Sequence, residues 1–480
     1  MTPTSKKLPL LLCGLLAACA VGPDYQRPSA ETPAAYKENQ GWKEAAPKDR
    51  VPKGKWWQVF NDPQLDALEE RLSISNQNIR QAEAQYRLAR AQAQGARAAY
   101  YPGVNANLGV TRGVSAGGGK VSPPVETTRT LSLDASWEAD LWGRVGRGVE
   151  AGEASAEASA ADLENVRLSA QAELAQDYFL LQTADAQKRL LDATVTAYEK
   201  TLQLTQNLYA AGVGSAVDVA QAETQLKTAR AQALDIGVQR AQLEHAIATL
   251  IGKTPAEFSL PPFEHLAKTP SIPVGLPSEL LERRPDIAAA ERRVAAANAQ
   301  IGVARAAFFP ALTLSAQGGF NSTAASNWLT APNRFWAIGP ALAQTLFDGG
   351  LRRAQSEQAE AAYEGSVAAY RQTVLGGFQE VEDNLAALRI LQDEASAQND
   401  AVQAARKSVT LTTNQYRAGT VSYLNVMTME TLALNNERSA LSIQGRRLTA
   451  CVVLIKALGG GWETAAKKDA PTDDARLSQK

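Results

Sequence analysis

The sequence is short of the residues that usually carry enzymatic or metal chemistry. Its 480 residues include two histidines, three cysteines and three methionines, and aromatic residues make up 6% of the chain. The 49 basic and 50 acidic residues leave a net charge of −1, which argues against a nucleic-acid binder held by bulk electrostatics. With only His245 and His265, a histidine-rich metal site or a histidine-based catalytic triad is not expected. We therefore expect no enzyme, no metal site and no nucleic-acid partner.

The first residues have the features of a secretion signal. Two lysines precede a short apolar stretch, residues 8–16, which is too short to span a bilayer. The stretch runs into Leu16–Cys19, which is similar to a bacterial lipobox. We expect residues 1–18 to be removed, and Cys19 to carry diacylglycerol on its thiol and an acyl chain on its amine. A chance cysteine near a cleavage site is the alternative. Because Ala20 is not an aspartate, the bacterial sorting rule favours the outer membrane.

After this processing, Cys451 would be the last free cysteine, so no intramolecular disulfide is expected. It lies in an apolar helical stretch and is interpreted as a small buried hydrophobic residue. The longest uncharged run, residues 306–333, contains prolines and glycines and cannot form a continuous apolar helix. The sequence therefore predicts a secreted, lipid-anchored chain without a helical membrane span.

The chain contains two copies of one unit, offset by 207 or 208 residues. The matching segments are 96–102 with 304–310, and 204–212 with 411–419. A proline-rich linker, residues 254–276, separates repeat 1 (residues 65–253) from repeat 2 (residues 277–460). An extended N-terminal segment, residues 19–64, comes first, and a polar tail, residues 461–480, comes last.

Each repeat is predicted to contain an alanine-rich helix, a β-hairpin, a helix of some 65 residues and a return helix after a glycine-marked turn. The expected helices are 65–100, 143–208 and 216–251 in repeat 1, and 277–308, 350–416 and 421–458 in repeat 2. At 1.5 Å per residue the long helices would reach about 95–100 Å. Apolar residues at seven-residue spacing among small neighbours predict coiled-coil-like packing; solvated, charged helices are the alternative.

Alternating apolar and polar residues predict strands in the two hairpins, about 103–142 and 310–347. The apolar positions of one strand are Leu131, Leu133, Ala135, Trp137, Ala139 and Leu141, and the polar positions are Ser132, Asp134, Ser136, Glu138 and Asp140. Strands of this length suit a tilted transmembrane β-strand. We expect the apolar face to meet lipid, and Asp134, Glu138 and Asp140 to line a water-filled lumen. A solvated soluble sheet is the alternative.

Four strands in lipid would leave unpaired backbone groups at both edges, so the sheet must close by oligomerisation. Two subunits would supply eight strands and a barrel filled by side chains. Three subunits would supply twelve strands, which leaves room for a lumen. The strand count therefore predicts a trimer.

Five motifs, taken in order, carry a family resemblance. They are Val21–Pro28, Trp56–Pro63, Leu281–Ile287, Tyr416–Gly419 and Ala457–Trp462. Together they resemble the lipoprotein outer-membrane factors of tripartite efflux pumps, the OprM and NodT type, which are distantly similar to TolC. The resemblance implies a mainly α fold with transmembrane β and two structural repeats per chain. It also implies a homotrimer with a 12-stranded β-barrel and a long periplasmic α-helical barrel.

The resemblance further implies partners and sites. The partners would be a periplasmic adaptor protein and an inner-membrane transporter of the resistance–nodulation–division class. The adaptor-docking tips would include Tyr209, Gly212, Gly214, Tyr416 and Gly419. The periplasmic gate would include Leu424, Asn425 and Thr428. Relatives often carry an aspartate where this chain has Thr428, which puts an acidic gate there in doubt. Asp218 could supply the carboxylates instead, or it could simply stabilise a helix N-terminus.

The function implied is a passive outer-membrane exit duct for drugs and xenobiotics, lipid-anchored and extending into the periplasm. Two alternatives stay open. One is a conduit of the same fold for heavy-metal or protein export. The other is a lipid-anchored coiled-coil lipoprotein without a pore. No cofactor is expected apart from the covalent lipid on Cys19.

Overall fold

A computed structural model describes residues 21–38, 54–114, 125–270, 272 and 283–460. The predicted signal, the lipidation site Cys19 and the polar tail lie outside the described residues. The chain divides into two compact units. Unit 1 comprises residues 1–29, 85–160 and 289–371, and unit 2 comprises residues 30–84, 161–288 and 372–480.

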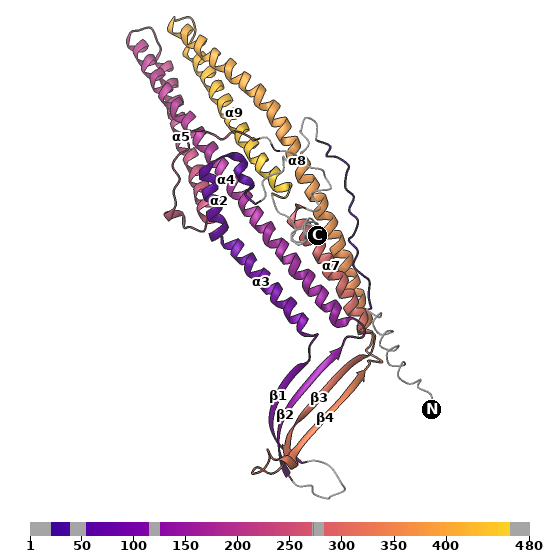
Figure 1. Cartoon of the computed structure of the whole chain (residues 1–480). Coiled ribbons are helices and arrows are strands. Elements are labelled where there is room, and N and C mark those ends of the chain that lie inside the picture. The colour runs from indigo at the N-terminus through magenta and orange to yellow at the C-terminus, as the bar shows by residue number, and fades with distance from the viewer. Residues whose placement is uncertain (1–20, 39–53, 115–124, 271, 273–282, 461–480) are drawn as a thin grey trace, which may run out of the picture. The chain divides into compact units, whose positions relative to one another are not determined.

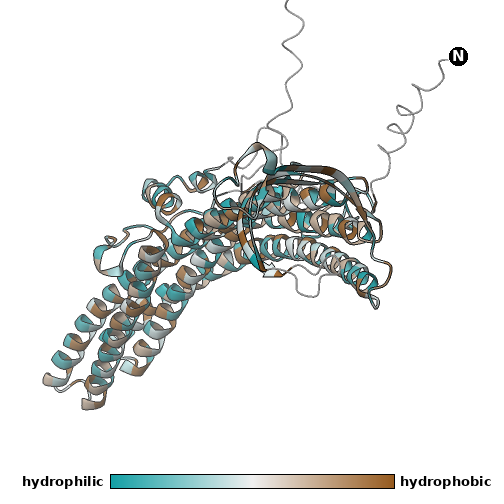
Figure 2. Ribbon diagram, turned by 90° about the horizontal axis from the view of Figure 1, so that it is seen from below, coloured by the Kyte–Doolittle hydropathy of each residue, from teal (hydrophilic) through white to brown (hydrophobic). Residues whose placement is uncertain are grey.

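The four strands of unit 1 form one antiparallel sheet in the order β1-β2-β3-β4 (Figure 1). The strands are β1 (Gly103–Val114), β2 (Val125–Ala139), β3 (Ala311–Ser322) and β4 (Arg334–Ala343). The central pair, β2 and β3, joins the hairpins of the two repeats. Seen from below, the sheet is curved (Figure 2). The two predicted hairpins thus combine into one sheet.

The helices after the hairpins have the same lengths in both repeats. Helices α4 (Arg144–Ala210) and α8 (Leu351–Arg417) each contain 67 residues, about 100 Å at 1.5 Å per residue. The return helices α5 (Ala216–Leu250) and α9 (Tyr423–Ala457) each contain 35 residues. The predicted repeat is therefore a repeat of structure.

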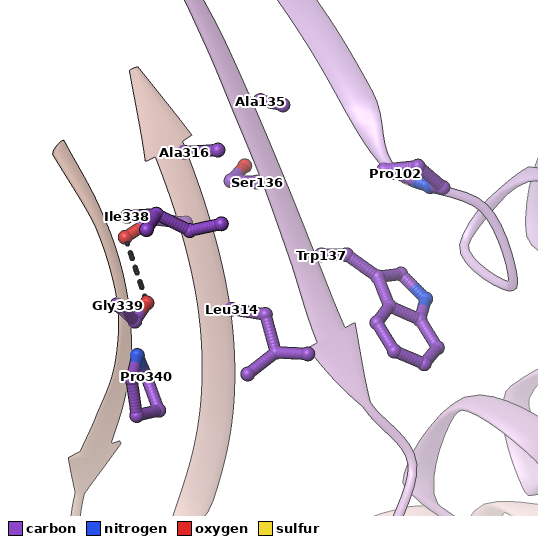
Figure 3. Close-up of a pocket in the computed structure, with 10 residues that line it drawn as sticks. Pro102, Ala135, Ser136, Trp137, Leu314, Ala316, Ile338, Gly339 and Pro340 are labelled. Carbon is purple, nitrogen blue, oxygen red and sulfur yellow. Dashed lines mark hydrogen bonds between the residues drawn. The ribbon is translucent and has the colours of Figure 1, made fainter. Parts of the chain in front are cut away.

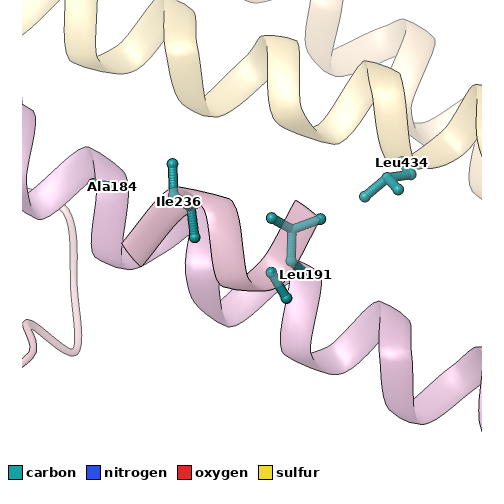
Figure 4. Packing of buried hydrophobic residues seen from close by; sticks show 5 residues of the cluster. Ala184, Leu191, Ile236 and Leu434 are labelled. Atoms are coloured by element: carbon teal, nitrogen blue, oxygen red, sulfur yellow. The ribbon is translucent and has the colours of Figure 1, made fainter. Parts of the chain in front are cut away.

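The buried residues of α5 follow the heptad spacing that the sequence predicts. Over the first part of the helix they are Ala222, Leu226, Ala229, Ala233 and Ile236, at alternating steps of four and three; Ile247, Ala248 and Leu250 near its end are also buried. Ile236 packs in a cluster with Leu191 of α4 and Leu434 of α9 (Figure 4). A mixture of small and large residues at such positions lets helices approach closely and interlock. This confirms coiled-coil-like packing within unit 2.

Two predicted helices begin or divide differently from the prediction. The helix expected over 65–100 is two helices, α2 (Pro63–Ser75) and α3 (Gln77–Ala98). Asn76 has extended backbone between them, donates its side-chain amide to the Leu250 carbonyl at 2.8 Å, and accepts from the Ile79 amide at 3.0 Å. The helix breaks here because Asn76 caps α3 and its side chain is bonded to Leu250, the last residue of α5. In repeat 2, the helix expected over 277–308 is α7, which spans Pro285–Ala306; residues 277–282 lie outside the described residues.

The described residues also include three short 3-10 helices, namely η1 (Trp56–Phe60), η2 (Pro255–Glu257) and η4 (Ala331–Asn333). Both Trp56 and Trp57 of η1 are buried, and the Trp56 indole donates to Gln171 of α4 at 3.2 Å. The motif Trp56–Pro63 therefore anchors the N-terminal part of unit 2. No helix among the described residues is long and apolar enough to cross a membrane.

Candidate functional site

The sheet has one apolar face that is continuous across all four strands. The strand register places the apolar positions opposite one another, in the rows Val104, Ala135, Ala316, Ile338 and Ala106, Leu133, Gly318, Trp336. The largest of these side chains are exposed: Leu133 is 60% exposed, Ile338 75% and Trp336 79%. An apolar surface of this extent on a chain marks a site that meets lipid or another apolar partner.

A hollow of about 390 Å³ lies on the sheet near the C-terminal end of β2 (Figure 3). Its lining includes Trp137 of β2, Leu314 of β3 and Pro340 of β4. The Trp137 indole donates to the Tyr100 carbonyl at 3.0 Å. None of the lining residues is charged, so the hollow extends the apolar surface.

Aromatic residues gather at the same end of the strands. They are Tyr100, Tyr101, Trp137, Trp142, Phe308 and Phe309. Trp142 stacks on Phe309 with ring centroids 4.7 Å apart, and its indole donates to the Pro310 carbonyl at 2.8 Å. Rings of this kind are typical of the boundary between hydrocarbon and water on transmembrane strands. These six aromatic residues, called the aromatic collar below, therefore mark the level at which the strands would leave a membrane.

The opposite face of the sheet is polar on β1, β2 and β3, as the alternation predicts, whereas β4 places Phe335, Ala337 and Ala341 there. Asp134 of β2 pairs with Gln317 of β3 in the register, and it accepts hydrogen bonds from Asn107 and from Ser132. Glu138 forms an ion pair with Arg144, whose Nε donates to it at 2.8 Å. The sequence reading missed Arg144, although a basic residue six positions after an acidic one was visible.

One of the three predicted lumen residues lies outside the strand. The strand β2 ends at Ala139, so Asp140 is not on its polar face. Asp140 instead accepts the backbone amides of Val145 at 2.9 Å and Gly146 at 2.7 Å, at the start of α4. The first amides of a helix have no partner within the helix and carry partial positive charge, which a carboxylate stabilises. Asp140 therefore caps a helix.

The motif Val21–Pro28 docks on the helices of unit 1. The Val21 amide donates to the Trp142 carbonyl at 3.0 Å, and Asn298 of α7 donates to the Pro23 carbonyl at 3.0 Å. The Tyr25 hydroxyl donates to Glu291 at 2.8 Å. At Gly22, an added Cβ would lie 2.5 Å from the Gly302 Cα. The motif thus requires glycine because two backbones touch there.

The motif Leu281–Ile287 is explained by one buried arginine in unit 2. Arg284 donates to Asp286 at 2.7 Å, to Glu380 of α8 at 2.7 Å and to the Ala457 carbonyl at 3.1 Å. Its side chain is only 8% exposed. A buried guanidinium is stable only when such partners surround it. Arg284 therefore ties the start of α7 to α8 and to the end of α9.

Both helix tips are closed by a glycine in the left-handed region. Gly212 has φ 75° and donates to the Tyr209 carbonyl at 2.9 Å, and Gly419 has φ 72° and donates to the Tyr416 carbonyl at 2.9 Å. Gly214 donates to the Leu208 carbonyl at 3.0 Å. This is the glycine-capped helix end that the sequence predicts.

The two predicted tip tyrosines differ in their exposure. Tyr209 is 53% exposed, whereas Tyr416 is 6% exposed and packs against Tyr423 with ring centroids 5.7 Å apart. Tyr416 therefore fills the interior of its tip, and it is Tyr209 that offers a ring at the surface. The sequence showed two similar motifs and did not reveal this difference.

The predicted gate residues of α9 share one exposed face. Leu424, Asn425 and Thr428 are all exposed, and the Thr428 hydroxyl donates to the Leu424 carbonyl at 2.8 Å. Asp218 forms a capping box at the start of α5. It donates its amide to the Ser215 hydroxyl at 3.1 Å, and its carboxylate accepts the Ser215 amide at 3.3 Å. The helix-capping reading of Asp218 is thus correct, and its part in a gate stays a prediction.

A half-buried polar cluster near the tip was missed from the sequence. Glu430 of α9 accepts from Thr201 of α4 and from Gln225 of α5, each at 3.3 Å, and Tyr423 donates to Gln225 at 3.0 Å. Burial raises the pKa of Glu430 to about 7. A glutamate within the apolar stripe of α9 is the signal that could have found it. Among described side chains, no three His, Cys, Asp or Glu come together as metal ligands.

Comparison with known proteins agrees with this geometry. The family described as "Outer membrane efflux protein" matches residues 68–253 and 276–460. The probable efflux pump outer membrane protein TtgC of Pseudomonas putida is 31% identical over 93% of this chain and 94% of its own. The outer membrane protein OprJ of Pseudomonas aeruginosa is 32% identical over 95% of each chain.

Solved structures show the same fold. The outer-membrane channel OprN superposes with a TM-score of 0.88 at 31% identity, over 93% of this chain and all of that one. The outer membrane protein VceC of Vibrio cholerae gives a TM-score of 0.80 at 30% identity, over 86% of this chain and 100% of its own. These are TolC-like channels. The chain belongs to the outer membrane efflux protein family, and it is an outer-membrane exit duct of an efflux system.

Proposed function

We propose that this duct passively conducts drugs and other small organic compounds, delivered by an adaptor and an inner-membrane transporter. The observation that carries the proposal is the sheet, whose apolar face spans four strands while Asp134 and Glu138 occupy the other face. On the same chain, the long helices would extend the conduit by about 100 Å. Related proteins are named for the efflux of antibiotics and toluene and for the export of pyoverdine.

The duct is proposed to be a homotrimer. In the described sheet, β1 and β4 are the edge strands, and both carry exposed apolar residues such as Leu108, at 70%, and Ile338. An edge strand in lipid leaves unpaired amides that cost several kcal/mol each (on the order of 4–8 into hydrocarbon). Three copies close both edges with twelve strands, which is enough for a lumen. Native mass spectrometry in detergent checks this, and a monomer or dimer as the sole species would contradict it.

The partners are proposed to dock at the helix tips. Tyr209 is the exposed tip aromatic, next to the glycine turn at Gly212. Tyrosine is one of the residues most often found at the energetic centre of protein interfaces. A photo-reactive amino acid at position 209 should cross-link the periplasmic adaptor in cells, whereas one at the buried position 416 should cross-link far less.

The lipid is proposed to sit on Cys19. Val21 is bonded to the Trp142 carbonyl beside the aromatic collar. Two residues of chain span at most about 8 Å, so a lipid on Cys19 would reach the same membrane boundary. Replacing Cys19 by Ser should abolish labelling with palmitate, and retained label would reject the site. The trimer should still assemble, because the strands do not depend on the lipid.

The function is tested by deletion and complementation. Deleting the gene should raise susceptibility to several unrelated drugs, and the intact gene should restore resistance. The purified protein should also conduct ions in planar bilayers. Resistance unchanged across a broad panel of drugs and metals, together with no conductance, would favour a lipoprotein without a pore. If susceptibility changes only toward metals, or if protein secretion is defective, the protein is still an exit duct, but its substrates are metals or proteins.

A further inference from the structure

A cavity of about 430 Å³ in unit 2 lies outside every site described above. It is lined by three helices, α4, α8 and α9. Its charged lining residues are Arg189 of α4, Arg406 of α8, and Glu437 and Arg447 of α9. Three guanidinium groups against one carboxylate leave the lining with an excess of two positive charges.

The positive charges are only partly compensated within the cavity. Arg406 is paired with Glu437, and Arg189 donates to the Phe263 carbonyl. The Nε of Arg447 is buried and has no hydrogen-bond partner among the described residues. Leaving a buried charged donor unpaired costs more than an ordinary lost hydrogen bond. The neighbouring Arg446 is different, because it is 60% exposed and lies 3.6 Å from Glu394.

The rest of the lining suits a carbon skeleton that carries several acidic groups. Leu190, Val402 and Leu441 supply apolar contacts, while Asn399 and Gln444 supply neutral donors and acceptors. The volume is that of sites for small organic molecules and is far larger than a simple oxyanion needs. A guanidinium presents two parallel donors that match a carboxylate.

We propose that this cavity binds a small organic polycarboxylate through Arg189, Arg406 and Arg447. One carboxylate is held by the guanidinium of Arg447, and a second lies between Arg189 and Arg406 at the rim. The ligand then bridges α4 of repeat 1 and α8 and α9 of repeat 2, so binding stabilises their contact. This site is independent of the duct's substrates and of the helix tips.

Thermal unfolding of the full-length protein in detergent tests the proposal, with citrate as the probe and sodium chloride at matched ionic strength. Citrate should raise the unfolding temperature in a saturable way. It should bind at least about tenfold more tightly than inorganic phosphate. Arg447→Gln should weaken the citrate effect about tenfold or more, since it removes a charge-assisted hydrogen bond. Arg446→Gln should leave the effect unchanged.

Three results would overturn the site. In the first, citrate raises the unfolding temperature no more than sodium chloride does. In the second, citrate and phosphate bind equally well. In the third, Arg446→Gln and Arg447→Gln weaken citrate binding equally. If Arg447→Gln does not assemble, Arg189→Gln at the exposed rim provides the second variant. Arg189→Gln should also weaken the binding of citrate. If this variant folds and binds citrate as well as the unchanged protein does, the proposal is wrong.

Discussion

Gln225 and Glu430 belong to different repeats, yet the Gln225 amide donates to the Glu430 carboxylate at 3.3 Å. Gln225 lies on α5 and Glu430 on α9. Thr201 of α4 donates to the other carboxylate oxygen at 3.3 Å. One acidic side chain therefore joins three helices close to the tips.

This contact predicts a pH-dependent stability. Burial raises the pKa of Glu430 to about 7, above its value in an unfolded chain, about 4.3. The folded protein therefore holds a proton that the unfolded chain releases, so stability falls as pH rises from about 4 to 7 and then levels off. Glu430→Gln should remove this dependence of stability on pH, the slope measured below. It should also raise the free energy of unfolding at pH 8 by on the order of 2 kcal/mol.

Denaturant unfolding between pH 5 and pH 8 measures the effect of Glu430→Gln. The control is Glu364→Gln, which removes an exposed glutamate from α8 and should keep the slope. If Glu430→Gln and the unchanged protein lose stability equally over this range, Glu430 is not the group that titrates.

A second buried acid predicts a stabilising substitution. Glu69 of α2 is 0% exposed, and neither carboxylate oxygen has a hydrogen-bond partner among the described residues. Burial, and then the nearby Asp66, raise the pKa of Glu69 well above its ordinary value. Glu69→Leu should therefore stabilise the protein by about 1–3 kcal/mol, with the larger gain at pH 8 than at pH 5.

The neighbouring Glu70 is the matched control for that change. It forms an exposed ion pair with Lys55 at 2.6 Å, and such pairs contribute little to stability. Glu70→Leu should change the unfolding temperature little. Destabilisation by Glu69→Leu would show that its carboxyl group has a partner that the isolated chain lacks.

Two adjacent glycines of β3 predict opposite outcomes for the sheet. A Cβ at Gly319 would lie 1.9 Å from the Leu131 carbonyl oxygen and 2.7 Å from the Ser132 Cα. At Gly318 the nearest atoms would be 3.6 Å away or more, which is ordinary contact. Gly319→Ala must push β3 away from β2, at a cost of about 1–3 kcal/mol or more.

The amount of assembled protein in the outer membrane, measured by native gel, should fall several-fold in Gly319→Ala. Gly318→Ala should assemble normally. Normal assembly of both variants would mean that the β2–β3 contact differs in the membrane.

The gate can be tested without removing a helix cap. Asp218 is part of a capping box with Ser215, so Asp218→Ala would both uncap α5 and remove a charge. Asp218→Asn removes the charge and keeps an acceptor for the Ser215 amide. If three carboxylates form a ring, Asp218→Asn should raise the conductance in planar bilayers and weaken cation selectivity. Unchanged conductance, together with an open pore in Leu424→Ala, would identify the seal as apolar.

The sequence by itself determined the features that depend on neighbours along the chain. Alternation in residues 131–139 identified β2 and its two faces, because side chains of a strand point alternately to either side. Glycine at Gly212 and Gly419 identified the tips, because only glycine adopts positive φ at little cost. The repeat offset identified the two halves, since each copy follows the same local rules.

Only the tertiary structure decided the features that depend on distant residues. Pairing of β2 with β3 brings together Asp134 and Gln317, and no local pattern fixes that register. Asp140 lay in the alternation, but the start of α4 offered its carboxylate unpaired amides. No local pattern shows which distant residues Glu430 and Arg447 meet. Packing of neighbouring helices half-buries both residues, which raises the pKa of Glu430 and leaves the Arg447 Nε without a hydrogen-bond partner among the described residues.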